Sequence, residues 1–534
     1  MRRLLPKNKK LLNIILAVLL TLPAIISLLR PGFFPTDDGE WMVVRLSDFH
    51  RSVVAGQLPV RWAARLNFSY GYPVFNFLYP LSLYWGELFH LIGFSFVWSI
   101  KLVFIFSFIL SAVFMYLFVA EAIGPVAGII GATFYTYTPY RFLDVYVRGS
   151  IGEAVSFVFI PLIFWAAYKI SQKPKKIFMA IGGLSFGALI MSHNIMAMIF
   201  TPFILTYMLF LYFRNKSSTL LLFYSFTLFL GLAIACFFWL PAFYDKKFII
   251  LDSVAVANPL DHFPTLKQLL IPSWGYGPSI PGSGDKASYQ LGLVHLLAVG
   301  AAFLALDWQA GLFLVVFVIT CFLMLPISTL VWRYLPMMNR IQFPWRFLAL
   351  TSFAGAFLAG GLGRIIKKKK TLLMAIVLLV ILINFRYAKP ISFFNRPDSF
   401  YATNEATTTV KDEYLPIWVK EKPIQRATQK AELITGVGEI TNLAFNSKRV
   451  TFEVNASQES VVQINTVYFP GWMAKIDSQS VAIDYQNNRG LMQLKVPSGN
   501  HQITVEFKET PVRLLADFVS VIGLLAVVIL FLLK

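Results

Sequence analysis

Two adjacent carboxylates follow the first hydrophobic segment of this chain, in the run Thr36-Asp37-Asp38-Gly39-Glu40. A carboxylate at a membrane surface can act as a general base on an acceptor hydroxyl. It can also hold a divalent cation that offsets the charge of a phosphate. A third role is structural, because Asp38 at the start of a helix would accept hydrogen bonds from free backbone N–H groups as an N-cap. The residues alone leave the three interpretations open, and the two side chains can divide the roles between them.

Arg148 and Glu153 form a second group of candidates, at the start of a later apolar segment. Charged side chains at the edge of a membrane are unfavourable unless they have partners, so such positions often mark functional sites. Arg148 has the charge to bind a phosphate, and Glu153 has the charge to orient a substrate or a cation. The alternative is that the two residues only form a salt bridge with each other at the surface.

His193 and Asn194 occupy a tight turn between two apolar runs, in Ser192-His193-Asn194. A histidine that is buried in such a turn needs hydrogen-bond partners. His193 is therefore either a structural residue of the turn or a substrate ligand or proton carrier.

Arg346 lies in the run Arg340-Ile-Gln-Phe-Pro-Trp-Arg346, in the first turn of a predicted helix. A guanidinium group and a helix N-terminus both attract anions, which favours a phosphate clamp. The alternative is that Trp345 anchors the helix in the aromatic belt of the membrane while Arg346 extends towards water.

The composition is that of a polytopic membrane protein. Of the 534 residues, 57% are hydrophobic and only 14% are charged, whereas soluble domains carry about 25% charged residues. The net charge of +20 lies largely in short runs between apolar segments, such as Lys173, Lys175 and Lys176. Such runs are typical of membrane topology, so we expect no nucleic-acid partner. Cys236 and Cys321 both lie in apolar runs, which gives no disulfide framework.

Twelve segments are candidates for crossing the bilayer. They are residues 11–29, 98–120, 124–139, 153–170, 177–192, 195–213, 219–241, 290–306, 310–325, 345–363, 371–388 and 512–533. Five cations precede the first segment, namely Arg2, Arg3, Lys7, Lys9 and Lys10, and the basic connections are 171–176, 214–218 and 364–370. If the chain starts in the cytoplasm, these connections and the C-terminal Lys534 all fall on the cytoplasmic side. We therefore predict that both termini are cytoplasmic.

The long polar segments then lie outside, beginning with a first outer loop at residues 30–97. Within this loop the spacing of apolar and charged residues predicts an amphipathic helix over 39–55, lying in the membrane interface. Ionisable residues therefore gather at the outer membrane face, where we expect the function to be.

Residues 389–511 have a different pattern from the rest of the chain. Apolar and polar residues alternate in short stretches separated by turn signals such as Pro470-Gly471 and Ser498-Gly499-Asn500. This pattern predicts an extracytoplasmic β-sandwich, with 389–429 as a linker that returns to the membrane domain. The predicted organisation is a transmembrane domain at 1–388, a β-rich domain at 389–511 and a final transmembrane helix at 512–534.

Several runs give the chain a family resemblance. They are Asp38-Gly39, Asp48-Phe-His50, Gly56-Gln-Leu-Pro59-Val-Arg61-Trp62, Gly71-Tyr-Pro73, Phe77-Leu-Tyr79-Pro80-Leu81, Tyr146-Val-Arg148-Gly149, Ser192-His193-Asn194, Phe343-Pro-Trp345-Arg346, Tyr468-Phe-Pro470-Gly471-Trp472 and Pro497-Ser-Gly499-Asn-His501. With them the chain resembles bacterial membrane proteins labelled 6-pyruvoyl-tetrahydropterin synthase-related, the YfhO-like membrane proteins and, more distantly, the GT-C glycosyltransferase superfamily. The resemblance covers nearly the whole chain and implies a location in the bacterial plasma membrane.

GT-C enzymes have many transmembrane spans, so with the twelve segments above we expect a GT-C-like fold of about 12 transmembrane helices. The resemblance also implies an activity. Such enzymes move a sugar from a polyprenyl-phosphate carrier to an acceptor at the outer membrane face, here a cell-envelope glycan, lipid or protein. Asp38 matches the acidic residue of the first outer loop, with Asp37 as second choice. By the same resemblance Arg148, Arg346 and Arg340 would meet the carrier phosphate, while Glu153, His193 and Asn194 would line the cavity.

A divalent cation, Mg or Mn, would be held by Asp37 and Asp38 if the enzyme uses one. Several GT-C members have one residue between two acidic residues, whereas the two acids are adjacent here, which leaves open both the use of a metal and the identity of the base.

Two other functions compete with the glycosyltransferase. A transporter or flippase of lipid-linked sugars would show paired halves and charges at mid-membrane, but the chain has no evident repeat. A non-catalytic envelope scaffold would use the β-rich domain to bind wall polymers. Membrane lipids are partners under each of these hypotheses.

Overall fold

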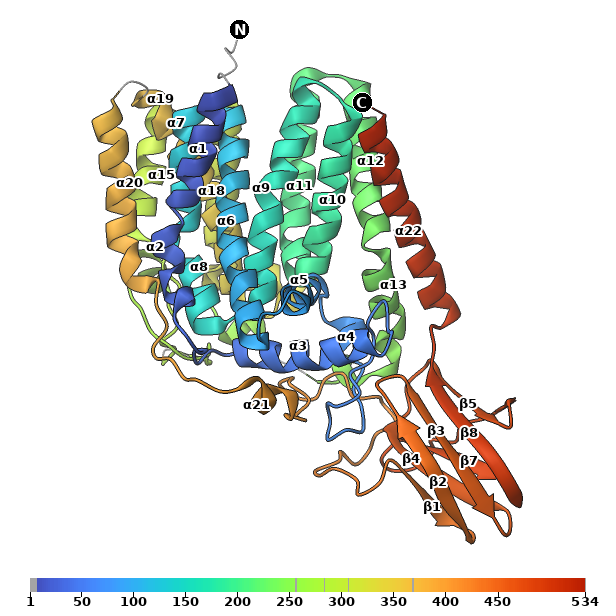
Figure 1. Cartoon of the computed structure of the whole chain (residues 1–534). Coiled ribbons are helices and arrows are strands. Elements are labelled where there is room, and N and C mark those ends of the chain that lie inside the picture. Colours follow the sequence, from blue (N-terminus) through green and yellow to red (C-terminus); the bar gives the residue numbers. More distant parts are fainter. Residues whose placement is uncertain (1–6, 255–256, 283, 306, 367–368, 534) are drawn as a thin grey trace.

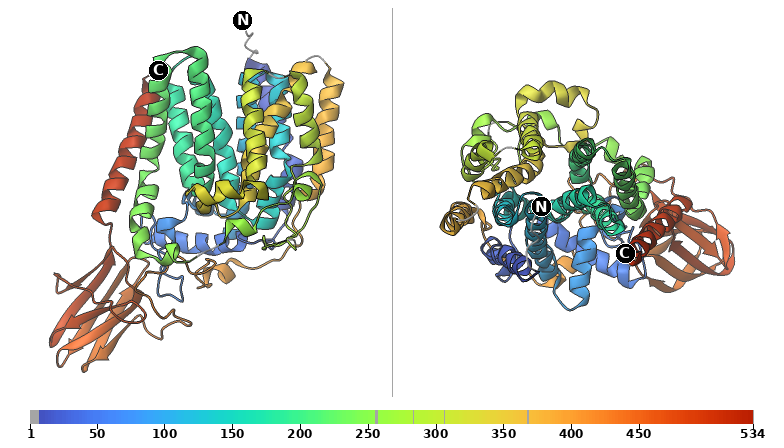
Figure 2. Two further views of the ribbon diagram at one scale, coloured as in Figure 1. Left: turned by 180° about the vertical axis from the view of Figure 1, so that it is seen from behind. Right: turned by 90° about the horizontal axis from the view of Figure 1, so that it is seen from above.

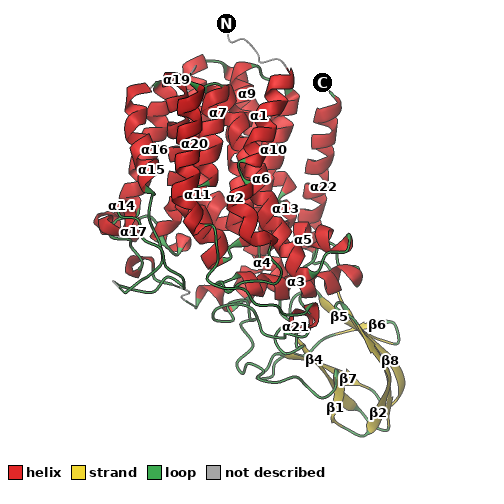
Figure 3. Ribbon diagram, turned by 60° about the vertical axis from the view of Figure 1, so that its left-hand side comes forward, coloured by secondary structure: helices red, strands yellow, loops and turns green. Residues whose placement is uncertain are grey.

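The computed structural model describes residues 7–254, 257–282, 284–305, 307–366 and 369–533. It consists of a bundle of long helices, a layer of short helices and loops across one end of this bundle, and two β-sheets beyond that layer (Figures 1 and 3). Several cations counted in the topology prediction, namely Arg2, Arg3, Lys367, Lys368 and Lys534, lie outside the described residues.

The helices follow the apolar segments of the sequence closely. They are α1 (Lys7–Leu19), α2 (Leu22–Ile25), α3 (Gly39–Val54), α4 (Val74–Phe77), α5 (Leu81–Leu91), α6 (Phe96–Ala122), α7 (Pro125–Thr136), α8 (Pro139–Phe142), α9 (Ile151–Gln172), α10 (Lys176–Ser192), α11 (Asn194–Asn215), α12 (Ser218–Ile234), α13 (Cys236–Asp245), α14 (Leu266–Leu270), α15 (Leu293–Ala302), α16 (Trp308–Leu323), α17 (Thr329–Tyr334), α18 (Leu348–Gly360), α19 (Leu362–Ile365), α20 (Lys370–Asn384), α21 (Asp398–Ala402) and α22 (Pro511–Leu532).

Seven helices among the described residues are long and apolar enough to cross a membrane, and the number rises to nine if two bent pairs count as spans. The bends measure 65° after Ile234 and 89° after Leu323, so the segment predicted at 219–241 is not one straight helix. Three other predicted segments form shorter apolar helices, α7, α10 and α15. The chain is thus a helical membrane protein, while the count of twelve spans stays a prediction.

The first residues of α1 and the last of α22 lie at the same end of the bundle (Figure 1). The connections between α9 and α10 and between α11 and α12 are also at this end, and they carry the basic residues of 171–176 and 214–218. The β-sheets lie beyond the opposite end, to one side of the bundle and beneath α22 (Figure 2). This arrangement is compatible with the predicted topology, but which end faces the cytoplasm stays a prediction.

The helix predicted at 39–55 is present as α3, and it lies across the end of the bundle together with α4 and α5 (Figure 1). Most of its residues are buried, including Arg45 and Asp48. Other parts of the protein thus cover most of the surface of α3, and its location in the membrane interface stays a prediction.

The β-rich part forms two antiparallel sheets. The larger has the strand order β2-β3-β8-β5-β6 and the smaller has the order β1-β4-β7. Alternate apolar residues of both sheets, such as Phe452 and Ile464, fill one shared core, as in a sandwich. The strands are β1 (Ala431–Thr435), β2 (Gly438–Phe445), β3 (Arg449–Ala456), β4 (Ser460–Val467), β5 (Trp472–Ile476), β6 (Gln479–Val481), β7 (Leu491–Val496) and β8 (Gly499–Phe507).

Residues 389–430, which we name the strap, connect α20 to the sandwich. The strap runs back over α3 (Figure 1). Its Phe394 exchanges backbone hydrogen bonds with Phe33, both at 2.9 Å, and its Arg396 Nη1 lies 2.7 Å from Glu40 Oε1. The strap is thus bound to the first outer loop along its length, and with α3 it covers the end of the bundle.

Candidate functional site

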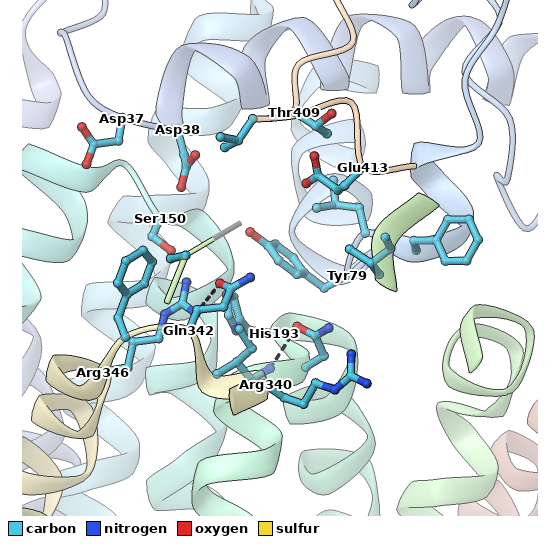
Figure 4. Close-up of a pocket in the computed structure, with 18 of the residues that line it drawn as sticks. Asp37, Asp38, Tyr79, Ser150, His193, Arg340, Gln342, Arg346, Thr409 and Glu413 are labelled. Carbon is cyan, nitrogen blue, oxygen red and sulfur yellow. Dashed lines mark hydrogen bonds between the residues drawn. The ribbon is translucent and has the colours of Figure 1, made fainter. Parts of the chain in front are cut away.

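A large cavity lies between the end of the helical bundle and the covering layer of α3 and strap (Figure 4). Its volume is about 1540 Å³. Seven of the eight residues that the sequence marked as candidates line this cavity. They are Asp37, Asp38, Arg148, His193, Asn194, Arg340 and Arg346. The eighth, Glu153, lies directly behind the wall.

Asp37 and Asp38 are held against the turn that carries Arg148. The backbone N–H of Asp37 donates to the carbonyl of Val147 at 3.3 Å, and that of Asp38 donates to the carbonyl of Arg148 at 2.9 Å. Although Asp38 occupies the N-cap position of α3, its side chain makes no capping hydrogen bond. The cap is supplied by Thr36, whose Oγ1 accepts from the Gly39 N–H at 2.9 Å. The structural interpretation of Asp38 is therefore wrong, and both half-buried carboxylates face the cavity.

The two aspartates differ from ordinary surface carboxylates in their surroundings. Burial raises the pKa of Asp37 to about 6, while the positive charge of Arg148 acts in the opposite direction and the negative charge of Asp38 adds to the rise. Asp37 therefore exchanges its proton near neutral pH, at the entrance to a site that is rich in arginine.

The positively charged side of the cavity is organised by Glu153, whose side chain is 0% exposed. Its Oε1 lies 2.9 Å from Arg148 Nη2 and 3.2 Å from Arg346 Nε. Its Oε2 accepts a hydrogen bond from the Tyr140 hydroxyl at 2.7 Å. Arg148 also contacts Asp144 Oδ1 at 2.8 Å. The Arg148–Glu153 salt bridge is thus formed, but deep in the protein rather than at the surface, and the prediction that Glu153 lines the cavity is wrong.

The position of Trp345 decides between the two interpretations of Arg346, a phosphate clamp or a helix anchored in the aromatic belt. Its ring is only 3% exposed, and the guanidinium of Arg148 lies over it at 4.6 Å from the ring centre. A tryptophan in that position cannot serve in an aromatic belt. Arg346 donates to the backbone carbonyl of Ile341 at 2.9 Å and to Gln342 Oε1 at 2.7 Å, so its head group is fixed at the cavity wall.

His193 lies at the N-terminus of α11, next to this arginine pair. Its Nδ1 accepts from the backbone N–H of Met196 at 3.3 Å, so the ring proton is on Nε2 in the neutral form. Nε2 is 4.0 Å from Glu153 Oε1, and the ring packs against Tyr79 with centres 4.7 Å apart. His193 is therefore both the cap of its helix and a residue of the cavity, while Asn194 beside it is exposed to the cavity.

Arg340 is placed differently from the other cations. Its side chain is 63% exposed and lies 2.9 Å from Asp252 Oδ1, to which Lys246 is also paired. It lines the cavity with an exposed side chain, and Figure 4 shows its guanidinium pointing away from Arg346. Arg340 can thus attract an anion towards the cavity, but in this structure its charge is shared with Asp252.

Several cavity residues were missed by the sequence analysis, and Arg45 is the one that a signal could have revealed. Asp38, Trp41 and Arg45 follow the spacing i, i+3, i+7, so they share one face of α3, and all three line the cavity.

Residues 406–411, 413 and 414 of the strap line the cavity as well. The sequence predicted that this linker returns to the membrane domain, but nothing in its polar run indicates which of its residues reach the cavity.

A second group of missed residues comes from the loop before α15. The hydroxyl of Ser279 donates to Asp285 Oδ2 at 2.8 Å and bonds His262 Nδ1 at 2.9 Å. Tyr289 stacks on Trp345 with ring centres 5.6 Å apart. Trp345 Nε1 donates to Ser279 Oγ at 3.3 Å, and His262, Ser279 and Tyr289 line the cavity. This network therefore keeps Trp345 in place at the cavity wall.

Among the described residues no group of three or more His, Cys, Asp or Glu side chains is arranged to hold a metal ion. Asp37 and Asp38 offer two carboxylates, and Mg²⁺ is often bound by one or two carboxylates together with phosphate oxygens and water. The donor atoms therefore fit a cation shared with a phosphate better than a cation held by protein alone.

The family of the chain follows from its sequence. Residues 75–390 match a family described as "6-pyruvoyl-tetrahydropterin synthase related domain; membrane protein". This protein belongs to that family. The match covers more than half of the chain, so the predicted family and the predicted location in a membrane are both confirmed.

A curated relative is an uncharacterized protein of Lactococcus lactis subsp. cremoris (strain MG1363), which is 22% identical over 204 residues, 37% of this chain and 33% of that protein. The matched part therefore spans about a third of the length of the relative.

Two solved structures are similar to part of this chain. The arabinofuranosyltransferase AftD from Mycobacteria superposes with a TM-score of 0.47 and 16% identity over 72% of this chain and 27% of AftD. The oligosaccharyltransferase of Archaeoglobus fulgidus, tethered with an acceptor peptide, superposes with a TM-score of 0.41 and 12% identity, over 76% of this chain and 60% of that protein. What these enzymes act on says nothing by itself about this chain.

Proposed function

We propose that this protein is a membrane glycosyltransferase that moves a sugar from a polyprenyl-phosphate donor to an acceptor outside the cytoplasm. The observation that carries the proposal is the meeting of two unlike groups in one cavity. Half-buried Asp37 and Asp38 face a fixed cationic wall that contains Arg148 and Arg346, with the neutral ring of His193 beside them.

The cationic wall is suited to the phosphate of the donor. A lipid phosphate leaves readily when its developing charge is met by fixed positive groups in a site with little water. Arg346 is held by three contacts and cannot move away from such a group. Arg340 and Lys246, which also line the cavity, add charge that would attract the phosphate towards this position.

One side of the cavity is suited to the polyprenyl chain. It is apolar and is lined from α10, α11 and α13 by Ile190, Ile195, Met198, Phe238, Trp239 and Phe243. The side chains of Trp239 and Phe243 are 36% and 80% exposed. This wall would allow an isoprenoid chain to remain in the membrane while its phosphate lies in the cavity.

Asp38 is the best candidate for the base that activates the acceptor hydroxyl. It faces the cavity, and no capping hydrogen bond occupies its carboxylate. With the phosphate on the opposite side, a single displacement would invert the anomeric centre of the sugar. If a divalent cation takes part, Asp37 and Asp38 would hold it, and it would neutralise charge on the phosphate.

The decisive experiment incubates purified full-length protein with polyprenyl-phosphate sugars of several kinds and measures release of the polyprenyl phosphate. We expect release with at least one sugar, loss of about 100-fold or more in Asp38→Asn, and a similar loss in Arg346→Ala. Glu121→Gln, in a half-exposed pair with Lys169, is the matched control and should keep full activity.

Two other results would contradict the proposal. Movement of a labelled carrier across a vesicle membrane without its release would indicate the flippase. Unchanged wall-polymer binding in Asp38→Asn, with no release from any donor, would indicate the scaffold. Addition of a chelator tests whether a metal is needed, and retention at the anomeric centre would exclude the single displacement.

A further inference from the structure

The wall of the cavity opposite the cationic group comes largely from the strap, at residues 406–414. A connecting segment between domains is normally mobile and makes few specific contacts. This one is instead fixed to the first outer loop and contributes side chains to the cavity, which raises the question of what those side chains bind.

The strap is held in place by side chains of the first outer loop. Arg45 donates through Nε to Thr408 Oγ1 at 2.9 Å and through Nη2 to the carbonyl of the same residue. Tyr72 bonds Thr409 Oγ1 at 2.8 Å and accepts from the Tyr414 N–H at 3.0 Å. Thr408 has a φ of +66°, which is unusual for a β-branched residue. These contacts maintain a backbone shape that a free linker would not adopt.

Within this wall, Glu413 is a carboxylate that the proposed reaction does not yet use. It is 9% exposed and lines the cavity. Its one hydrogen bond among the residues that the structure describes comes from the Lys411 backbone N–H, at the long distance of 3.3 Å. Most of its accepting capacity is therefore directed into the cavity, where Figure 4 shows it beside Thr409.

Two aromatic residues complete this part of the cavity. The Tyr79 hydroxyl points into the space between Asp38 and Glu413 (Figure 4). Its pKa is raised by burial and by the charge of Asp38, so it remains a hydrogen-bond donor. Trp41 lines the cavity with 37% of its surface exposed. It lies one helical turn before Arg45, which holds the strap, so its ring is next to the same wall.

We propose that Trp41, Tyr79, Thr409 and Glu413 form a subsite for a saccharide unit of the acceptor. A carboxylate accepts hydrogen bonds from neighbouring hydroxyls of a sugar, the tyrosine and threonine hydroxyls add a donor and an acceptor, and an exposed tryptophan ring packs against the apolar face of the sugar.

The charges also select among saccharides. The carboxylates of Asp38 and Glu413 lie on two sides of the Tyr79 hydroxyl (Figure 4). Arg45 and Lys411 also line the cavity, but Arg45 is bonded to Thr408. We therefore expect an anionic sugar to be repelled at this position. The acceptor unit is therefore an uncharged sugar, whereas the phosphate of the donor is bound at Arg346, on the other side. This inference rests on the proposed function, because a sugar bound here is an acceptor only if the protein catalyses a transfer reaction.

Binding of simple sugars tests the subsite without any donor. The probes are the methyl glycosides of glucose, galactose, mannose, N-acetylglucosamine and arabinofuranose, with methyl glucuronide as the anionic comparison. Binding to the full-length protein in lipid nanodiscs is followed by saturation-transfer NMR and by tryptophan fluorescence. We expect at least one neutral glycoside to bind and the glucuronide not to bind.

Variants then locate the binding. Glu413→Gln and Trp41→Ala should each raise the dissociation constant about tenfold or more, because hydrogen bonds to a charged acceptor and aromatic packing contribute that much. Glu421→Gln, also in the strap but outside the cavity lining, is the matched control and should leave binding unchanged. Thr409→Val gives a second polar test if Glu413→Gln does not fold, which gel filtration and thermal melting would reveal.

The results separate this inference from the proposed function. Loss of sugar binding in Glu413→Gln with retained binding of undecaprenyl phosphate, measured by native mass spectrometry, supports the subsite. The absence of binding by all neutral glycosides overturns it, even if the transfer assay succeeds, and equal binding in Glu413→Gln and Trp41→Ala also overturns it. Sugar binding without release from any donor would leave the subsite in place and overturn the glycosyltransferase.

Discussion

Glu153 keeps two arginines together at the centre of the cavity wall. Each guanidinium would repel the other if the carboxylate between them were absent, and Trp345 covers only one face of Arg148. Buried ion clusters of this kind contribute little net stability, but they are sensitive to the loss of one partner. The cluster therefore fixes geometry, and its two arginines have no alternative position once Glu153 is changed.

Glu153→Gln is predicted to destabilise the protein by about 3–5 kcal/mol, because it leaves buried positive charge without its partner. Thermal unfolding of the purified variant in nanodiscs measures the effect. The comparison is Glu121→Gln, whose ion pair with Lys169 is half exposed and should change stability by about 1 kcal/mol or less. Equal melting temperatures for the two variants would contradict this role of Glu153.

The raised pKa of Asp37 predicts how the stability of the protein depends on pH. Its pKa in the folded protein is about 6, compared with an ordinary value of 3.8. The folded state therefore holds the proton more tightly than the unfolded state, and stability from this group is lost as the pH rises through this interval. The melting temperature of Asp37→Asn minus that of the wild type should therefore be larger at pH 8 than at pH 4. A difference between the two proteins that does not change with pH would contradict the pKa shift.

Among the elements, the turn before α9 positions both sides of the site. Residues Leu143–Arg148 form a short π-helix, a form that is frequent at functional sites. The next residue, Gly149, has a φ of +65° and passes so close to the first outer loop that a Cβ atom would lie 2.4 Å from Thr36 Oγ1 and 2.6 Å from the Gly39 nitrogen. Only glycine allows this approach, which brings the aspartates to Arg148.

Gly149→Ala is therefore predicted to separate Asp37 and Asp38 from Arg148 and to reduce sugar transfer. The left-handed backbone alone would cost about 1–2 kcal/mol, and the contact with Gly39 adds to this. Gly93→Ala is the control, since Gly93 also has a positive φ, of +104°, but no atom lies within 4 Å of its added Cβ. Loss of transfer in both variants would show that backbone conformation, and not the close approach, is what matters.

The sequence alone was sufficient to identify the candidate site residues that lie at the ends of apolar segments. Arg148, His193 and Arg346 were each predicted from alternation across the membrane, because every second connection between successive spans lies at the same end of the bundle. The return of the strap to the membrane domain was also predicted, but its contacts at the cavity were not. The contact between Arg45 and Thr408 joins residues 363 positions apart, and neither helical spacing nor strand alternation carries information about a loop returning over such a distance.

For the whole molecule, the sandwich is attached to the bundle by buried charges. Arg513, at the start of α22, is fully buried and lies 2.9 Å from Asp245 Oδ2 at the end of α13. The same oxygen accepts from Asn76 Nδ2 at 2.9 Å, and Arg61 contacts Glu509 and Asp517. The first outer loop, α13 and α22 thus meet beside the sandwich.

Asp245→Asn tests whether this junction controls the strap as well as α22. The variant leaves Arg513 buried without its charge partner, and we expect a stability loss of about 3 kcal/mol or more. If the junction holds the sandwich in place, hydrogen exchange should also become faster in residues 406–414, although none of them contacts the substituted side chain directly. Glu506→Gln removes an exposed pair with Lys508 on the sandwich and should leave exchange in the strap unchanged. Faster exchange confined to α13 and α22 would mean that the first outer loop alone, through Arg45 and Tyr72, holds the wall of the cavity.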